Sequence, residues 1–320
     1  MKIIERPIYL NRIIRQLDRG MMLVLVGQRR VGKSFMLRAL ADWLSLNKPA
    51  ANVVFIDKDF GSFDFIRSSA DLYAHVLEML PSSGGDNYLL IDEVQDIEGY
   101  ETALRSLYAE GRCQIVVTGS NAYMFSSEIA TKFSGRYIEI PIRSLDYGEF
   151  LTFHRLQDSN ESLLSYLQFG GMPGLANYHF DEVPEIKAYL QGVYNNFFSD
   201  HGMRNCISGE MPYVFGSIEK VMEGVVRHHL LILNYDVYVG VLPSGEIDFV
   251  ARNGDETVYV QVCYKLSGPD TIKREFGNLQ AIGDDYPKYV VTMEDIVGPL
   301  KEYPGIRHVH LRDFLTNDKF

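Results

Sequence analysis

Residues 27–34 read Gly-Gln-Arg-Arg-Val-Gly-Lys-Ser, a full match to the phosphate-binding pattern G-x-x-x-x-G-K-[ST]. Residues 21–26, just before it, are apolar and strand-like, and apolar positions recur at helical spacing in residues 35–44, just after it. Strand, glycine loop and helix are the context that this motif requires. The sequence therefore predicts an α/β domain with a nucleoside-triphosphate site.

The residue types of this loop suit a triphosphate. The two glycines allow backbone conformations that expose a concave row of N–H donors, and the N-terminus of the following helix adds partial positive charge. Lys33 is expected to reach the β and γ phosphates, and Ser34 to hold Mg²⁺ through its hydroxyl. The expected nucleotide contacts are Gly27, Arg30, Val31, Gly32, Lys33, Ser34 and Phe35.

A second part of the site is predicted at residues 88–93, where Tyr-Leu-Leu-Ile-Asp-Glu forms a short apolar strand that ends in two carboxylates. An acid at the end of a neighbouring parallel strand can reach the Mg²⁺ held at the loop, so Asp92 is expected to bind the metal. Glu93 is expected to orient the attacking water, because hydrolysis needs an in-line water and charge stabilisation more than covalent chemistry.

Two further candidates follow in the chain. Residues 114–121, Gln-Ile-Val-Val-Thr-Gly-Ser-Asn, form a strand with a polar end, where Asn121 or Ser120 either senses the γ-phosphate and the water or caps the strand. Arg136 follows in Phe-Ser-Gly-Arg-Tyr. It is interpreted either as an arginine finger, supplied in cis or from a neighbouring subunit, or as an ordinary surface arginine.

Composition limits the class of protein. The 320 residues suffice for two domains, and 46% hydrophobic and 23% charged residues are ordinary for a soluble globular protein. No apolar run approaches the ~20 residues of a membrane span, and a cytoplasmic location is expected. Cys113, Cys206 and Cys263 are scattered, which excludes a disulfide framework or a zinc site.

The charge distribution argues against a protein that coats DNA, because the net charge is −11. Local basic faces remain candidates for phosphate contact. Four arginines precede the first strand on a polar helix face, which is interpreted as a solvated surface: Arg6, Arg12, Arg15 and Arg19.

The order of elements predicts the organisation of the chain. Strands and helices alternate over residues 1–144, which favours a parallel sheet covered on both faces, with the ligand at the carboxyl ends of the strands. Residues 145–200 read as a small helical lid or linker. Residues 201–320 follow the order α-β-β-β-α-β, with acids on the first helix and Asp248 in the second strand.

This last order is the plan of the PD-(D/E)XK nuclease, or restriction-endonuclease-like, fold. Such a nuclease needs a second carboxylate and a lysine on the third strand, where this chain has Gln261 and Cys263. The preferred interpretation is a degenerate, inactive domain whose remnant site is Glu223, Asp248, Gln261 and Lys265. The alternative is that Lys265, two residues after Cys263, supplies the missing charge.

Several motifs in fixed order resemble the prokaryotic AAA-type ATPases with a C-terminal nuclease-like domain. They are the glycine loop, Leu-Leu-Ile-Asp-Glu-Val-Gln-Asp, Val-Val-Thr-Gly-Ser-Asn, Ser-Gly-Arg-Tyr-Ile-Glu-Ile, Gly-Gly-Met-Pro and Ser-Gly-Glu-Ile-Asp-Phe-Val. The resemblance implies an ATP-binding P-loop ATPase of the AAA+ or related signalling-ATPase branch that uses Mg²⁺. It assigns nucleotide roles to Lys33, Ser34, Asp92 and Glu93, and it extends to Asn121 and Arg136.

The chain departs from this family after residue 196. Relatives typically carry a winged-helix-like segment there, whereas here roughly a domain's worth of chain is missing, which puts sequence-specific DNA binding in doubt. We therefore retain three functions. The first is an ATPase that drives a conformational change in an attached, non-cleaving domain. The second is an ATP-dependent switch or interaction module with little turnover, and the third is an ATP-dependent DNA nuclease. DNA, an unknown protein and a second copy of the chain remain candidate partners.

Overall fold

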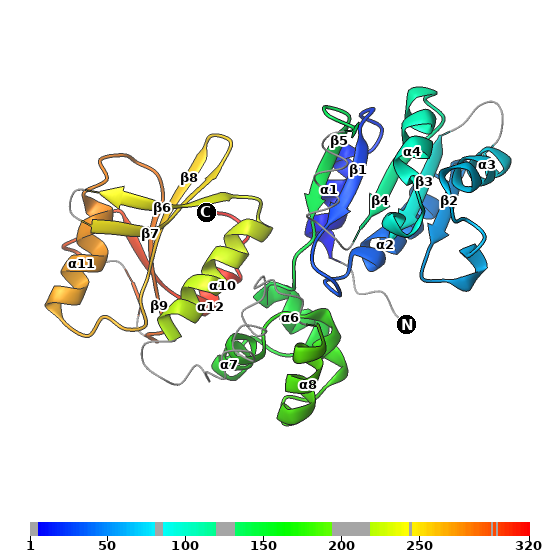
Figure 1. Cartoon of the computed structure of the whole chain (residues 1–320). Coiled ribbons are helices and arrows are strands. Elements are labelled where there is room, and N and C mark those ends of the chain that lie inside the picture. The colour runs from blue at the N-terminus through cyan, green and yellow to red at the C-terminus, as the bar shows by residue number, and fades with distance from the viewer. Residues whose placement is uncertain are drawn as a thin grey trace. The chain divides into compact units, whose positions relative to one another are not determined.

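The chain divides into two compact units, Met1–Arg143 and Ser144–Phe320, each with its own five-stranded sheet (Figure 1). The computed structural model describes residues 6–80, 86–119, 132–193, 218–242, 245–295, 297–298 and 300–320. The predicted division into three domains, with the helical segment separate from the C-terminal sheet, stays a prediction.

The sheet of the first unit is entirely parallel, with the strand order β2-β3-β4-β1-β5. Its strands are β1 (Met22–Val26), β2 (Asn52–Asp57), β3 (Asn87–Asp92), β4 (Gln114–Thr118) and β5 (Tyr137–Pro141). Every residue of the interior strand β1 is buried, as expected for a strand covered on both faces. The predicted α/β class and parallel sheet are confirmed for this unit.

Helices cover both faces of this sheet (Figure 1). They are α1 (Pro7–Gln16), α2 (Lys33–Asn47), α3 (Ser69–Met79) and α4 (Tyr100–Ala109), with short 3₁₀ turns η1 (Gly61–Phe63) and η2 (Val94–Asp96). The chain moves in opposite directions along the sheet before and after β2, so right-handed crossovers place α2 on one face and α3 and α4 on the other. Leu72 of α3 and Leu104 of α4 pack with Val24 of β1 in one buried cluster.

The second unit contains a mixed sheet with the strand order β10-β9-β8-β7-β6. Its strands are β6 (Asp236–Leu242), β7 (Gly245–Asn253), β8 (Glu256–Val262), β9 (Lys288–Thr292) and β10 (Ile306–His310). The pairs β6/β7 and β7/β8 are antiparallel, while β8/β9 and β9/β10 are parallel. The expected helix-strand order is present, and β10 was not predicted. The nuclease-like interpretation of this sheet stays a prediction.

The helical segment packs into the core of this second unit. Its helices are α6 (Tyr147–His154), α7 (Asn160–Phe169), η3 (Pro173–Asn177) and α8 (Val183–Val193), followed by α10 (Ile218–Ile232), α11 (Pro269–Gln280) and α12 (Leu311–Leu315). Phe150 of α6 and Tyr166 of α7 share one buried cluster with Val225 of α10 and Val260 of β8. On the other face, Phe276 of α11 packs on the sheet. None of the helices in the described residues is both long enough and apolar enough to cross a membrane.

Candidate nucleotide-binding site

The glycine loop lies between β1 and α2, at the carboxyl edge of the first sheet. Gly27 has φ 153°, and a Cβ there would lie 2.2 Å from the backbone oxygen of Ile142, so no larger residue fits. Gly32 has φ 101° and is the N-cap of α2. Because the N-cap has no side chain, the first N–H groups of α2 stay open to an anion. The loop therefore has the backbone shape that a phosphate site needs.

Lys33 is buried at the first position of α2. Its ammonium donates to the carbonyl oxygens of Gly27 and Gln28, both at 3.1 Å, so it points back under the loop. Burial lowers the pKa of Lys33, while the charges of Glu93 and Asp92 raise it. A triphosphate bound in the loop would stabilise the charged ammonium in this partly dehydrated position.

Arg6 is buried and donates a hydrogen bond to the backbone of the glycine loop. This corrects the interpretation of Arg6 as part of a solvated helix face. It is only 2% exposed, because it precedes α1 and turns inward. Its guanidinium donates to the carbonyl oxygens of Val31 and Arg143, both at 2.9 Å, and lies 4.5 Å from the centre of the Tyr9 ring. The sequence pattern missed this role, because the partners of Arg6 are distant backbone carbonyls.

Asp92, at the end of β3, is fully buried. The hydroxyl of Thr118 donates to Asp92 Oδ1. Burial raises the pKa of Asp92, and this effect outweighs the hydroxyls of Thr118 and Ser34, which lower the pKa. Asp92 Oδ2 is buried and has no hydrogen-bond partner among the described residues. A divalent cation near Ser34 would satisfy this oxygen, so these residues fit the predicted Mg²⁺ site.

Glu93 has a left-handed backbone conformation, with φ 50°, which is unusual for a residue other than glycine. Its N–H donates to Thr118 Oγ1 at 2.9 Å, and its carboxylate accepts a hydrogen bond from the side chain of Gln95. Thr118, at the end of β4, thus positions both acids. Sequence reasoning missed this role of Thr118, although a polar residue at the end of a buried strand was a visible signal.

The remaining candidates of the first unit, apart from Arg136, are the residues after β4 and three residues of the loop region. Asn121 and Ser120 lie outside the described residues. Within the loop, Arg30 is exposed with φ 65°, Val31 is buried and Phe35 is half-buried.

Arg136 lies at the amino ends of the strands, whereas the loop lies at their carboxyl ends. Its carbonyl oxygen accepts from the N–H of Met22, at the start of β1, while the loop begins after the end of that five-residue strand. The separation along the strand is about 17 Å, longer than an arginine side chain. Within one chain, Arg136 therefore does not serve the loop. Donation to a neighbouring subunit stays a prediction.

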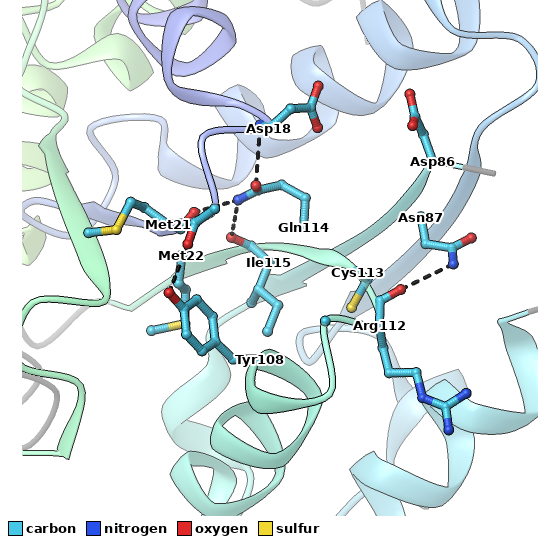
Figure 2. A pocket seen from close by; sticks show the side chains of 12 residues that line it. Asp18, Met21, Met22, Asp86, Asn87, Tyr108, Arg112, Cys113, Gln114 and Ile115 are labelled. Carbon is cyan, nitrogen blue, oxygen red and sulfur yellow. Dashed lines mark hydrogen bonds between the residues drawn. The ribbon is translucent and has the colours of Figure 1, made fainter. Parts of the chain in front are cut away.

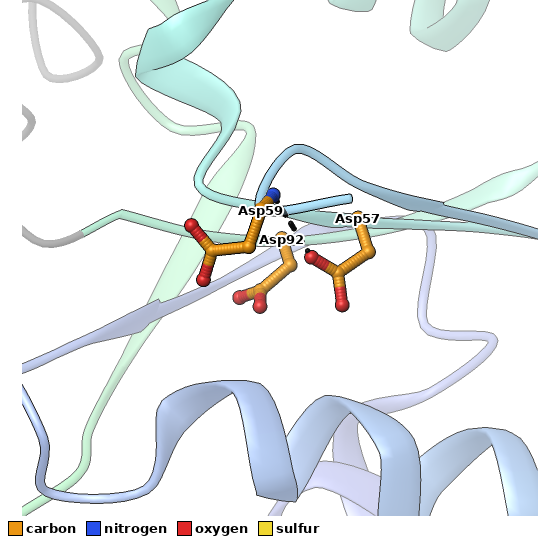
Figure 3. A group of neighbouring side chains, drawn as sticks. All are labelled: Asp57, Asp59 and Asp92. Atoms are coloured by element: carbon orange, nitrogen blue, oxygen red, sulfur yellow. Dashed lines mark hydrogen bonds between the residues drawn. The ribbon is translucent and has the colours of Figure 1, made fainter. Parts of the chain in front are cut away.

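Two acids that sequence reasoning did not single out lie beside Asp92. Asp57 ends β2 directly opposite Asp92 in the register of the two parallel strands, and Asp59 follows two residues later (Figure 3). Carboxylate oxygens of the three residues lie within 4.8 Å of one another. Asp57 is 1% exposed and forms an ion pair with Arg38 of α2 at 2.8 Å, while Asp59 is exposed.

A pocket of about 440 Å³ lies at the amino ends of β1, β3 and β4, the opposite ends of these strands from the loop. Figure 2 shows the residues that line it. The side-chain amide of Gln114 crosses it, donating to the carbonyl oxygen of Met21 and accepting from the N–H of Asp18. Tyr108 donates to the carbonyl oxygen of Gly20. These hydrogen bonds connect the strand ends to the preceding loop, which indicates a structural role.

The predicted remnant site of the second unit is partly brought together. Val262 N–H donates to Asp248 Oδ2 at 2.7 Å, and Gln261 Oε1 accepts from the N–H of Asp248 at 3.4 Å. The charge of Glu223, on α10, contributes to the raised pKa of Asp248. Lys265 is exposed beyond the end of β8, with its ammonium 5.3 Å from the centre of the Tyr264 ring.

Burial raises the pKa of Asp248 to about 7. An unfolded aspartate titrates near pH 4, so between about pH 4 and 7 the folded state binds more protons and its stability falls as the pH rises. Asp248→Asn keeps an oxygen that can accept from the Val262 N–H. We expect this variant to have the same unfolding temperature as the parent at pH 4, and an unfolding temperature a few degrees above that of the parent at pH 8. Thermal unfolding from pH 4 to 8 checks this, with Asp236→Asn, an exposed acid of β6, as control. Parallel pH profiles for parent and Asp248→Asn would contradict it.

The family model described as an AAA domain matches residues 19–151. This confirms the predicted AAA-type domain for that part of the chain, which contains the loop, Asp92 and Glu93. The match ends near the start of the second unit. The nuclease-like interpretation of the remaining residues therefore stays a prediction.

Two curated relatives are themselves uncharacterised proteins. One, from Haemophilus influenzae, is 27% identical over an alignment of 402 residues that covers 98% of each chain. This alignment is longer than the 320 residues of the present chain, so the relative has stretches without a counterpart here. The other, from Methanocaldococcus jannaschii, is 28% identical over 218 residues, covering 64% of this chain and 47% of the archaeal protein.

Solved structures give weaker likenesses. Domain III of the replication initiation protein DnaA from Thermotoga maritima has a TM-score of 0.37 at 14% identity, covering 66% of this chain and 95% of that chain. The Orc1 protein of Aeropyrum pernix, solved in complex with DNA, has a TM-score of 0.38 at 12% identity, covering 73% and 72%. No functional conclusion follows from scores this low.

Proposed function

We propose that this chain binds ATP with Mg²⁺ at the carboxyl edge of its first sheet and hydrolyses it. One observation carries the proposal: the glycine loop, Lys33, Asp92 and Glu93, predicted separately, all belong to this edge, where a buried oxygen of Asp92 has no partner among the described residues. The AAA-domain match over residues 19–151 supports it.

Each residue has a distinct task in this proposal. Lys33 and the first N–H groups of α2 bind the phosphates, and Ser34 and Asp92 hold the metal. Mg²⁺ bound there would offset the charge of the phosphate oxygens. Glu93 accepts a hydrogen bond from the attacking water and orients it in line with the γ-phosphate. Thr118 fixes both acids through its single hydroxyl.

The position of Arg136 extends the proposal to a second copy of the chain. Because Arg136 lies at the amino ends of the strands, it can stabilise the transition state only at the nucleotide site of a neighbouring subunit. Turnover per chain should therefore rise with protein concentration. Asn121 is the proposed sensor of the γ-phosphate in the same assembly.

The second unit is proposed as a non-cleaving partner of the ATP cycle. Gln261 offers only a neutral carbonyl oxygen, which already accepts from the N–H of Asp248, and Lys265 is exposed beyond the strand. DNA cleavage, which needs Glu223, Asp248, Gln261 and Lys265 to form a working metal site, ranks last of the three functions. Mg²⁺-dependent nicking of a plasmid, abolished by Asp248→Ala, would restore it.

A switch with little turnover is the second candidate. It is favoured by the alignment with the Haemophilus influenzae relative, in which this chain lacks stretches of sequence that could couple hydrolysis to a partner. Steady-state phosphate release with Mg²⁺, with and without duplex DNA, separates the two functions. Turnover that stops on chelation of Mg²⁺ supports the ATPase. ATP binding without turnover supports the switch, and absence of binding contradicts both.

A further inference from the structure

Three carboxylates meet where β2 and β3 end, and two of them belong to neither the glycine loop nor the acid pair of β3. Asp57, Asp59 and Asp92 contribute carboxylate oxygens that lie within 4.8 Å of one another (Figure 3). Two oxygens on opposite sides of one cation are separated by about 4.2 Å for Mg²⁺ and about 5 Å for Ca²⁺. The spacing therefore fits a single shared divalent cation.

The local charges leave this group with an excess of negative charge. Arg38 pairs with Asp57, and its guanidinium carbon lies 5.7 and 5.6 Å from the ring centres of Phe35 and Phe60. Two cations, Arg38 and the Lys33 ammonium, thus face four carboxylates, because the charge of Glu93 acts on Lys33 and on Asp59 as well. Buried charges need compensation by a counter-charge, and a divalent cation would provide it.

The buried oxygen of Asp92 is an independent indication of a ligand. Asp92 is 0% exposed, Thr118 occupies its Oδ1, and Oδ2 has no hydrogen-bond partner among the described residues. Leaving a buried charged oxygen without a partner is costly. A cation bound by this oxygen would remove that cost.

The loop that carries Asp59 is held in position before any ligand arrives. The Lys58 ammonium donates to the carbonyl oxygens of Phe63 and Ile66, both at 2.8 Å. The N–H of Asp59 donates to Asp57 Oδ1 at 3.1 Å, which fixes the two acids relative to each other. The carboxylates are therefore preorganised for a cation, as effective metal sites are.

We propose that Asp57, Asp59 and Asp92 bind a divalent cation in the absence of nucleotide, so that the metal is in place before ATP arrives. The proposal rests on the proposed function only through Asp92, which both sites share. Asp59 is the residue that distinguishes them, because it follows β2 and lies outside the glycine loop and the acid pair.

Titration of the nucleotide-free full chain with Mn²⁺, followed by electron paramagnetic resonance, tests this. The parent is expected to bind one Mn²⁺ per chain, displaced by Mg²⁺ or Ca²⁺. Asp59→Asn, an exposed and nearly isosteric change, is expected to weaken binding about tenfold or more. Asp64→Asn, an exposed acid of the same loop outside the group, is the matched control and should bind like the parent.

Asp57→Asn is a second variant, with circular dichroism to verify folding, and should also weaken Mn²⁺ binding. If the parent binds no Mn²⁺ without nucleotide, or if Asp59→Asn binds it as well as the parent, the proposal is wrong. A fluorescent ATP analogue on the same samples separates this from the proposed function. Binding of the analogue without binding of Mn²⁺ overturns only the cation site. Binding of Mn²⁺ without binding of the analogue overturns only the nucleotide site.

Discussion

Lys33→Ala is expected to abolish measurable ATP binding, with a loss of affinity of about a hundredfold or more. The ammonium lies under the loop, bonded to the carbonyl oxygens of Gly27 and Gln28, from where it can reach the phosphates. Hydrogen bonds to charged groups contribute about 1.5–3 kcal/mol each, and the lysine would make at least two with the triphosphate. Isothermal titration calorimetry with ATP and Mg²⁺ measures the change.

The control for this experiment is Lys132→Ala, because Lys132 belongs to the same unit, is half exposed and pairs with Glu101. It should bind ATP like the parent. Circular dichroism must show that Lys33→Ala is folded. If the folded variant binds ATP as tightly as the parent, the assignment of residues 27–34 as the phosphate loop is wrong.

Glu93→Gln is expected to bind ATP normally and to lower turnover by a factor of about 10²–10⁴, the range for loss of a general base. The amide keeps the size of the side chain, and its oxygen can still accept from Gln95. The backbone hydrogen bond to Thr118 is unaffected by the change. What is lost is the negative charge that attracts a proton of the attacking water.

Phosphate release under saturating ATP measures this effect, and Glu98→Gln, an exposed acid five residues later, serves as control. A binding titration on the same samples verifies that the site is intact. Rapid turnover by Glu93→Gln would transfer the water-orienting role to another residue.

The sequence predicted the local features of the nucleotide site well. Two of these features depend only on residues that are close in sequence, so they can be predicted without a structure. They are the strand-loop-helix pattern over residues 21–44 and the acid pair at the end of β3. Asp57 was missed for the opposite reason. Its position beside Asp92 follows from the order of strands in the sheet, which a linear pattern does not contain.

The C-terminal elements were harder to predict because polar residues fill buried positions. In β10, the buried residues include His308 and His310, which a hydropathy pattern assigns to the surface. His308 is accommodated because its ring lies 2.9 Å from Thr292 Oγ1 in the neighbouring strand. The packing of α6 and α7 with α10 joins residues that are far apart in sequence, so the spacing of apolar residues does not predict it.

The position of Arg6 has a practical consequence for anyone who isolates the ATP-binding unit. The family match begins at residue 19, so a fragment trimmed to it would contain every predicted residue of the nucleotide site. It would still lose the Arg6 guanidinium that links the carbonyl oxygens of Val31 and Arg143. Both carbonyl oxygens would then need new partners. A fragment that keeps the hydrogen bonds of the loop begins at or before Arg6 and includes Arg143.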